Sequence, residues 1–230
     1  MTDLSNTPGP TNTKAIILQQ LYNFPSNPYV DMLALAYPRH LRYANRWNFD
    51  YYVMHGNVVE EWDIKYGGWA KLRLILDALK AGYNYVVWLG IDTLIVDVDT
   101  DLREAQKEAR GIGLVEHPAP GNVPNCDAMY ITNSPEVIEF ISAWIDWFPG
   151  PLKGWHEQAM LNLLTLTPEG IRVLYPIHPK WNSTVKGGCH VDNAVVEGFH
   201  GEGPAENRLR LMKACLRMCD KKEREKVSRP

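Results

Sequence analysis

The chain has 230 residues, of which 45% are hydrophobic and 22% are charged, so it can bury the core of one substantial globular domain. Its formal net charge of −3 gives no general reason to expect nucleic acid or an anionic membrane surface as a partner, although it does not exclude a local basic groove. No stretch of the sequence approaches the length of a membrane-spanning helix.

The N-terminal segment, residues 1–13, is polar and lacks the apolar core of a secretory signal peptide. We expect this segment to be a disordered tail. Because no leader precedes the cysteines, the sequence predicts a cytoplasmic protein whose thiols are free.

Apolar runs and helical spacings alternate along the rest of the chain. Strands are predicted over residues 14–21, 49–54, 85–89, 111–115, 125–133 and 173–176, and a short strand and turn over residues 195–201. A second apolar run covers residues 93–96. Helices are predicted over residues 28–47, 69–81, 135–148, 155–166 and 207–219, with a polar helix or turn over residues 102–110. Pro38 is expected to kink or divide the first helix, and residues 221–230 to form a frayed, charged tail. The alternation is typical of an α/β fold with a mostly parallel, Rossmann-like sheet flanked by helices, and no repeat or linker divides it into more than one domain.

Residues 85–89, Tyr-Val-Val-Trp-Leu, form a short apolar run that is typical of a buried strand in the middle of a parallel sheet. The run breaks at Gly90, and a carboxylate follows at Asp92. Open α/β sheets bind ligands at the carboxyl ends of their central strands, where a carboxylate suits a hard divalent cation that also holds phosphate oxygens. The alternative is that Asp92 is only a turn residue, because acids are common in turns.

Positions near other ends of predicted elements are candidates for contacts to a nucleotide. Tyr22 lies in the loop after the first strand, where it can stack on a base or be an ordinary loop tyrosine. Lys71 and Arg73 lie near the start of a helix, where an anion is also favoured. The alternative for both basic residues is a solvated helix face, the commoner place for a charged side chain.

Six short segments occur in an order that resembles one enzyme family. They are Trp69-Ala70-Lys71, residues 85–95, residues 125–132, Glu157-Gln158-Ala159, Trp181-Asn182-Ser183 and Phe199-His200-Gly201. The series is similar to that of the GT-A glycosyltransferases, and most of all to the galactosyl, xylosyl and mannosyl transferase group that includes yeast and plant Golgi enzymes. The resemblance implies a GT-A catalytic domain over residues 14–202, followed by a C-terminal helix and charged tail over residues 203–230.

The same resemblance implies a metal site and a donor site. In the family an Asp-x-Asp motif ends a central strand, and its last acid binds a divalent metal that bridges the diphosphate of a nucleotide sugar. Asp92 matches that acid, and His200 matches a C-terminal histidine that completes the site; Mn²⁺ is the expected ion and Mg²⁺ the other candidate. Ordinary loop positions remain the alternative for His200 and Asn182. The donor-binding residues implied by the resemblance are Leu21, Tyr22, Lys71, Gly90, Ile91, Asp92, Asn182 and Gly201.

Three residues are candidates for the reacting end of the sugar. Glu157 and Gln158 match a pair that lies beside the reacting sugar and the acceptor, and in retaining members a side-chain amide sits near the anomeric carbon. Asp127 takes a place where relatives usually have a small residue. A carboxylate or amide suits an oxocarbenium-like sugar, while a cation and basic groups stabilise the charge on the departing diphosphate.

Gly90 departs from the family pattern, because it stands where the first acid of Asp-x-Asp contacts the ribose or the metal. Three consequences stay open at this point. The metal is held by Asp92, His200, phosphates and water, or its affinity is weaker, or the protein needs no metal.

The sequence therefore predicts a hexosyl- or pentosyltransferase that moves a sugar from a nucleotide-diphosphate sugar, with UDP as the expected nucleotide and with retention of configuration. The alternative is a non-catalytic relative that binds a nucleotide sugar or a glycan. A nucleotidyltransferase or dinucleotide dehydrogenase would carry a glycine-rich loop after the first strand, and residues 21–28 contain no glycine.

The acceptor is open among a glycan, a lipid-linked sugar, a protein and a modified base in DNA. DNA would need a basic groove, to which the C-terminal helix can contribute Arg208, Arg210, Lys213 and Arg217, and to which the tail over residues 221–229 can also contribute. Charges on such a helix are usually just solvated. Because the Golgi relatives carry a membrane anchor, a chain without one indicates a microbial or viral source.

Overall fold

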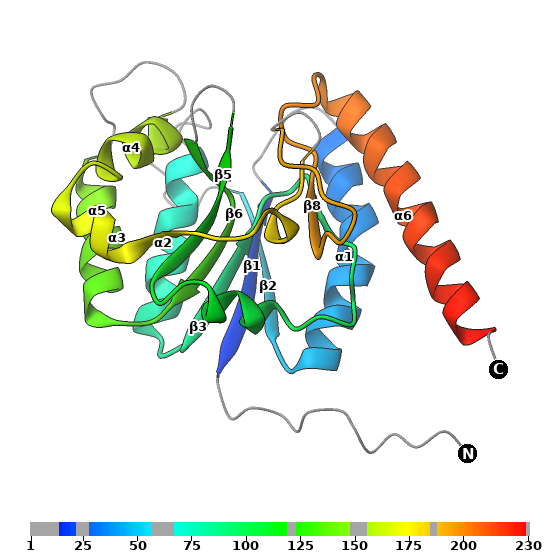
Figure 1. The fold of residues 1–230 in the computed structure, drawn as a ribbon, viewed down its shortest axis with the longest axis horizontal. Helices are drawn as coiled ribbons and strands as arrows, with labels where there is room; N and C mark the ends of the chain where they lie inside the picture. Colours follow the sequence, from blue (N-terminus) through cyan, green and yellow to red (C-terminus); the bar gives the residue numbers. More distant parts are fainter. Residues whose placement is uncertain are drawn as a thin grey trace.

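The computed structural model describes residues 14–21, 28–56, 67–118, 123–147, 156–184 and 188–228. A sheet of six strands lies at the centre, in the order β2-β1-β3-β6-β5-β7, with helices on both of its faces (Figure 1). Its strands are β1 (Ala15–Leu21), β2 (Asp50–His55), β3 (Tyr85–Leu89), β5 (Ile112–His117), β6 (Val123–Thr132) and β7 (Leu174–Pro176). The short strands β4 (Thr93–Ile95) and β8 (Val196–Gly198) form a separate antiparallel pair.

The predicted α/β fold with a mostly parallel sheet is confirmed. Strand β1 pairs in parallel with both β2 and β3, and β5 pairs in parallel with β7. The prediction that residues 85–89 lie in the middle of a parallel sheet is wrong, because β6 runs antiparallel to β3 on one side and to β5 on the other. Strand β5 ends at His117 and β6 begins at Val123, a connection too short for the crossover that parallel neighbours require.

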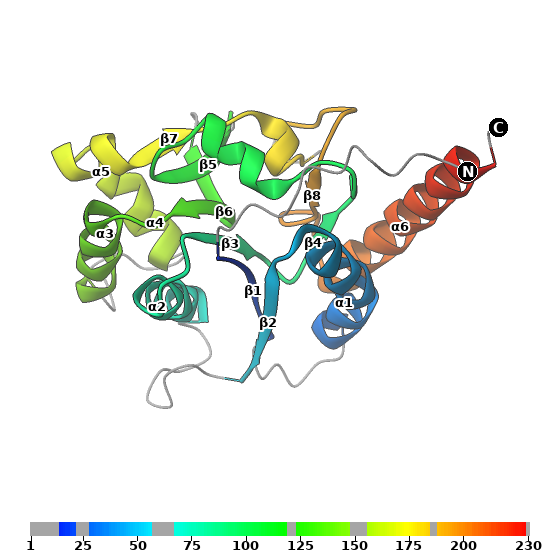
Figure 2. The same cartoon turned by 90° about the horizontal axis from the view of Figure 1, so that it is seen from below.

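Helices lie on both faces of the sheet (Figure 2), and a hydrophobic layer fills the space beneath them on each face. One face packs against α2 (Gly67–Lys80), α3 (Pro135–Asp146), α4 (His156–Leu164) and α5 (Pro168–Val173). The other packs against α1 (Pro28–Trp47), the 3₁₀ helices η2 (Leu102–Lys107) and η3 (Pro179–Trp181), and the β4–β8 pair. Successive side chains of a strand point to opposite faces, so Val86 and Trp88 join the first layer while Val87 and Leu89 join the second.

Pro38 was expected to kink or divide the first helix, and the division is wrong, because α1 is one helix from Pro28 to Trp47. A proline removes the hydrogen bond to the carbonyl four residues earlier, here that of Ala34. Both Ala34 and Pro38 lie on the exposed face of α1. Water can therefore solvate the freed carbonyl without a break in the helix.

The C-terminal helix α6 (Ala205–Val227) packs on the outer side of α1 rather than on the sheet (Figure 1). Met212 of α6 is fully buried with Met32 of α1 and Leu94 of β4. The frayed tail predicted from residue 221 is wrong, because the helix continues to Val227. Its last turns are anchored by two ion pairs, Glu223 with Arg39 at 2.6 Å and Lys226 with Asp99 at 2.8 Å. None of the described helices is long and apolar enough to cross a membrane.

Candidate functional site

The turn that follows β3 presents Asp92 at the carboxyl edge of the sheet. Strand β3 ends at Leu89, and β4 begins at Thr93, where it pairs antiparallel with Gly198 of β8. The amide N–H of Phe199 donates to the carbonyl of Asp92 at 2.9 Å, which places His200 beside the turn. Leu21 ends β1, the parallel neighbour of β3, so the carboxyl ends of both strands meet at this edge.

A buried polar pair, Gln19 and His40, fixes the backbone on both sides of Asp92. Gln19 Nε2 donates to the carbonyl of Gly90 at 3.0 Å, and Gln19 Oε1 lies 3.1 Å from His40 Nδ1. The amide N–H of Ile95 donates to His40 Nε2 at 3.1 Å. Since Nε2 accepts this hydrogen bond, it carries no hydrogen, so the hydrogen is on His40 Nδ1 and the ring is neutral. We call Gln19 and His40 the turn strap.

Acid should weaken the folded state through His40. Burial, reinforced by the charge of Arg39, lowers the pKa of His40 from 6.5 to about 3. The unfolded chain binds a proton there below pH 6.5 while the folded chain does not, so stability is intact above pH 6.5 and falls as pH decreases toward 3. From pH 6.5 to 4 we expect His40 alone to remove roughly 3 kcal/mol of the free energy of unfolding.

Denaturant unfolding of wild type and His40→Gln at several pH values would measure this effect. The variant should be less stable at neutral pH but lose less stability on acidification. The exposed His55 provides the matched control, because His55→Gln should leave the acid slope unchanged. Equal acid slopes for His40→Gln and wild type would contradict the assignment of a neutral, strapped His40.

Five polar side chains gather around the turn, and we call them the Asp92 group: Asp92, Asp127, His117, His200 and Arg208. His200 Nδ1 lies 3.2 Å from Asp127 Oδ2, close enough for charge attraction but not in hydrogen-bond geometry. The rings of His117 and His200 are stacked, with centroids 5.1 Å apart and 10° between their planes. Arg208 Nη1 donates to Asp92 Oδ2 at 3.0 Å. The group thus joins β5, β6, the turn after β3, and the start of α6.

Within the Asp92 group, the pKa of Asp92 is affected both by its burial and by the charges of its neighbours. The side chain of Asp92 is only 8% exposed. Burial, followed by the negative charge of Asp127, raises the pKa of Asp92, while His200 and Arg208 act in the opposite direction. Burial and the nearby His200 also lower the pKa of His117 to about 4, so this ring is neutral at physiological pH. A buried carboxylate with a second acid beside it favours a cationic ligand.

Several buried polar atoms at this place have no hydrogen-bond partner within the described part of the chain. They are His117 Nε2, both ring nitrogens of His200, and Asn182 Oδ1. A Cβ atom at Gly198 would lie 2.6 Å from Asn182 Oδ1 and 2.7 Å from His200 Cε1, so only glycine admits these two side chains together. Native structures seldom leave buried polar atoms unpaired, and their concentration here marks a place for a polar ligand.

The donor atoms of the group fit a divalent cation in kind. Carboxylates and an imidazole suit Mn²⁺, and carboxylates suit Mg²⁺. Among the described residues, however, no three His, Cys, Asp or Glu side chains already lie close enough together to hold a metal ion. The guanidinium of Arg208 now neutralises Asp92, and its side chain is 24% exposed, so it has room to move aside. Phosphate oxygens of a bound nucleotide would supply further ligands.

A second polar group lies on the other face of β6, around Cys126. Lys71 Nζ donates to the Cys126 carbonyl at 3.2 Å and lies 3.2 Å from Glu157 Oε1. Gln158 Oε1 accepts from the Cys126 amide at 3.0 Å, and Gln158 Nε2 donates to the Pro124 carbonyl. Burial raises the pKa of the Cys126 thiol to about 12, so it stays protonated. Lys71, Glu157 and Gln158 are therefore brought together, one residue along β6 from Asp127.

We expect Lys71 and Glu157 to be energetically coupled. Lys71 is 3% exposed and Glu157 is 18% exposed, so their attraction is only partly screened. In a double-mutant cycle with Lys71→Met and Glu157→Gln, the coupling energy should be about 1–2 kcal/mol. The exposed pair Arg73 and Asp77, on the same helix as Lys71, is the control and should give under about 0.5 kcal/mol. A coupling no larger than that of the control would contradict the pairing.

The remaining predicted residues have mixed positions. Asn182 lies beside the Asp92 group, since Asn125 Oδ1 accepts from both Asn182 Nδ2 and the Asp127 amide. Gly201, with a positive φ of 78°, lies in the turn between His200 and α6. Ile91 is in the turn itself, and Tyr22 lies outside the described residues.

The solvated-face alternative is wrong for Lys71, which is buried, and is confirmed for Arg73, which is half exposed. Three contributors were not assigned to this site from the sequence: His117, Asn125 and the turn strap. Arg208 was considered only for a basic groove. No local pattern marks any of them, because β-sheet pairing and the packing of α6 bring them in from distant parts of the chain.

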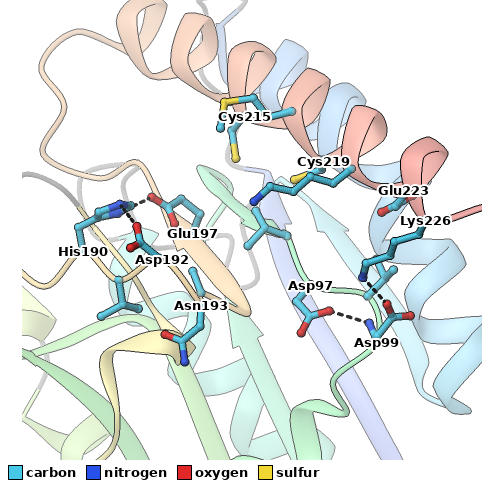
Figure 3. A pocket seen from close by; sticks show the side chains of 16 residues that line it. Asp97, Asp99, His190, Asp192, Asn193, Glu197, Cys215, Cys219, Glu223 and Lys226 are labelled. Atoms are coloured by element: carbon cyan, nitrogen blue, oxygen red, sulfur yellow. Dashed lines mark hydrogen bonds and ion pairs between the residues drawn. The ribbon is translucent and has the colours of Figure 1, made fainter. Parts of the chain in front are cut away.

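Figure 3 shows a separate hollow of about 410 Å³ between α6, the segment after β4 and the residues before β8. None of the predicted site residues lines it. Its charged side chains are largely matched with one another, as in the contacts of Lys226 with Asp99 and of His190 with Glu197. None of the unpartnered buried atoms found in the described residues belongs to its lining. The Asp92 group is therefore the stronger candidate site.

No protein-family profile and no curated protein sequence matches the chain. Solved structures do match. A glycosyltransferase involved in the glycosylation of the major capsid of PBCV-1 is 12% identical, with a TM-score of 0.67 over 87% of this chain and 99% of that one. The galactosyltransferase LgtC, in complex with donor and acceptor sugar analogs, is 14% identical, with a TM-score of 0.50 over 86% and 95% of the two chains. Mouse xyloside xylosyltransferase 1 is 10% identical, with a TM-score of 0.50 over 84% and 99%. At such identities the likeness shows the fold, which is that of the GT-A glycosyltransferases, as the sequence resemblance implied.

Proposed function

We propose that this chain, which has the GT-A fold, is a glycosyltransferase that moves a hexose or pentose from a nucleotide-diphosphate sugar, with a UDP-sugar as the donor. One observation carries the proposal. The Asp92 group, with its unpartnered buried nitrogens, lies at the carboxyl edge of β1 and β3, where sheets of this topology bind nucleotides.

The chemistry of the group suits the departure of a diphosphate. Two sources of positive charge lie beside Asp92. One is the guanidinium of Arg208, and the other is the positive end of the helix dipole of α6, which begins directly after Pro204. Asp92 and His200 are the proposed holders of Mn²⁺, or of Mg²⁺. When bound, such a cation would neutralise the charge that develops on the departing phosphate oxygens. His117, neutral and stacked on His200, keeps the plane of that ring fixed.

Leu21, Tyr22, Lys71, Gly90, Ile91, Asn182 and Gly201 remain the proposed donor-binding residues. Glu157, Gln158 and Asp127 remain the proposed residues at the reacting end, with retention of configuration as the proposed outcome. The structure supports them unequally. Both ends of the Gln158 amide are engaged by the backbone of β6, whereas the Asp127 side chain is 34% exposed and can reach a ligand.

The first test is calorimetric titration of UDP-hexoses, UDP-xylose and GDP-mannose into wild type and Asp92→Ala, with and without Mn²⁺. We expect one donor to bind in a manganese-dependent way and to lose that binding in the variant. Tight binding of a donor that changes neither when Mn²⁺ is left out nor when Asp92 is replaced by alanine would contradict the metal role of Asp92. Failure of every donor to bind would refute the glycosyltransferase proposal.

A non-catalytic protein that binds a nucleotide sugar or a glycan is the second candidate, and Gly90 is the feature in its favour. The two are separated by incubation with the donor that binds. A transferase slowly releases free sugar by transfer to water, whereas a binding protein leaves the donor intact. Release of sugar that disappears in Asp92→Ala would reject the second candidate.

A further inference from the structure

The space beside Gly90 is shared with Asp127. A Cβ atom placed on Gly90 would lie 3.3 Å from both the Asp127 carbonyl oxygen and Asp92 Oδ1, and 3.6 Å from Asp127 Cβ. The Gly90 amide donates to the Asp127 carbonyl at 2.6 Å, across the antiparallel pairing of β3 and β6. A side chain at position 90 would therefore start out next to the side chain that β6 already supplies.

The carboxylate of Asp127 borders both proposed metal holders. Its Oδ2 lies 3.2 Å from His200 Nδ1, and its Cβ and the carboxylate of Asp92 both border the space beside Gly90. His117 and Asn182, each more than nine-tenths buried, leave Nε2 and Oδ1 unpartnered at the same place. These atoms are independent signs of a missing polar ligand.

We propose that Asp127 supplies to a divalent cation the second carboxylate that Gly90 lacks, so that the cation is held by Asp92, Asp127 and His200. In the described structure these three side chains do not yet lie close enough together to hold a metal ion, so binding requires Arg208 to withdraw from Asp92 and the three side chains to converge. The inference rests on the proposed function and narrows the role of Asp127 from the reacting sugar to the cation. Acids at positions 90 and 127 together would, with Asp92, place three negative charges side by side, which is unfavourable. We therefore expect a carboxylate at only one of the two positions, and we expect the carboxylate to be movable from position 127 to position 90.

The test measures Mn²⁺ directly, through the loss of the electron paramagnetic resonance signal of free Mn²⁺ when protein is added in the presence of UDP. Four variants are compared with wild type: Asp127→Asn, Asp127→Gly, the exchange variant Asp127→Gly/Gly90→Asp, and Asp77→Asn. Asp77 is an exposed acid on α2 and serves as the control. UDP binding is followed separately by calorimetry without metal, and folding by circular dichroism.

We expect Asp127→Asn and Asp127→Gly to weaken Mn²⁺ binding at least about tenfold while Asp77→Asn does not. The exchange variant should recover most of that loss. Unchanged Mn²⁺ affinity in folded Asp127→Asn overturns the proposal, whether or not the exchange variant folds. A folded exchange variant that stays as weak as Asp127→Gly overturns the exchangeability. If wild type binds neither UDP nor a sugar donor, the proposed function itself fails, whereas UDP binding with no role for Asp127 sinks this inference alone.

Discussion

Replacing Asp92 with asparagine is expected to lower the rate of sugar transfer at least about 100-fold without lowering the free energy of unfolding. Activity falls because the variant removes the buried negative charge next to Arg208 and His200 that the proposed cation requires. Initial rates with the donor identified by calorimetry would measure the first effect. Thermal and denaturant unfolding of the two proteins would measure the second.

The stability half of this prediction follows from the raised pKa of Asp92, for which burial is the main cause. Between the unfolded value of 3.8 and the higher folded value, the folded state binds more protons, so stability falls as pH rises through that window. At neutral pH the charge therefore opposes folding, and asparagine relieves this while still accepting a hydrogen bond from Arg208. A variant that is both inactive and clearly less stable at pH 7 would point to a structural role for Asp92 instead.

Replacing Arg39 with methionine is expected to reduce the free energy of unfolding by roughly 3–5 kcal/mol. Arg39 is 2% exposed, and it donates to the carbonyls of Ile95 and Val96 and to Glu223. Methionine keeps most of the volume of the side chain, so the loss reports on the two buried carbonyls and on Glu223, all of which are left without this donor. Denaturant unfolding would measure it.

Arg42, one turn further along α1 and exposed, gives the matched control. Arg42→Met should change the free energy of unfolding by less than about 0.5 kcal/mol. A loss in Arg39→Met no larger than that would show that the hydrogen bonds and ion pair of Arg39 contribute little to holding α6 and β4 in place.

The order of strands and helices was predictable because the spacing of apolar residues along each segment indicates a strand or a helix without reference to the rest of the chain. The apolar run at residues 85–89 and the stripe through Leu72, Ile75 and Leu79 are local signals, and β3 and α2 follow them. The direction of β6 was not predictable from such patterns, since a buried strand reads alike whichever way it runs. The length of α6 was also missed, because a charged stretch predicts fraying unless distant partners such as Arg39 and Asp99 are known.

The candidate site was predictable in part. Gly90, Asp92 and His200 were singled out by an ordered resemblance, and pairing of β4 with β8 brings them together. The role of His117 could not be predicted, because its position in the site depends on the contact between the end of β5 and the turn after β8. Lys71 was assigned a donor contact or a solvated face. The sequence around a lysine does not show whether the folded protein provides a buried carbonyl and a carboxylate as its partners, as it does for Lys71.

The turn strap has a consequence for how this site can change. Gln19 and His40 grip main-chain atoms of Gly90 and Ile95, which every amino acid carries. The backbone conformation of the turn between β3 and β4 should therefore depend little on which side chains the turn carries. We therefore expect a change of carboxylate at positions 90 or 127 to alter the ligands of the site more than it alters the fold of the turn. A library randomised at positions 90, 91 and 127 would, for the same reason, be a sound starting point for selecting new ion or donor preferences on this scaffold.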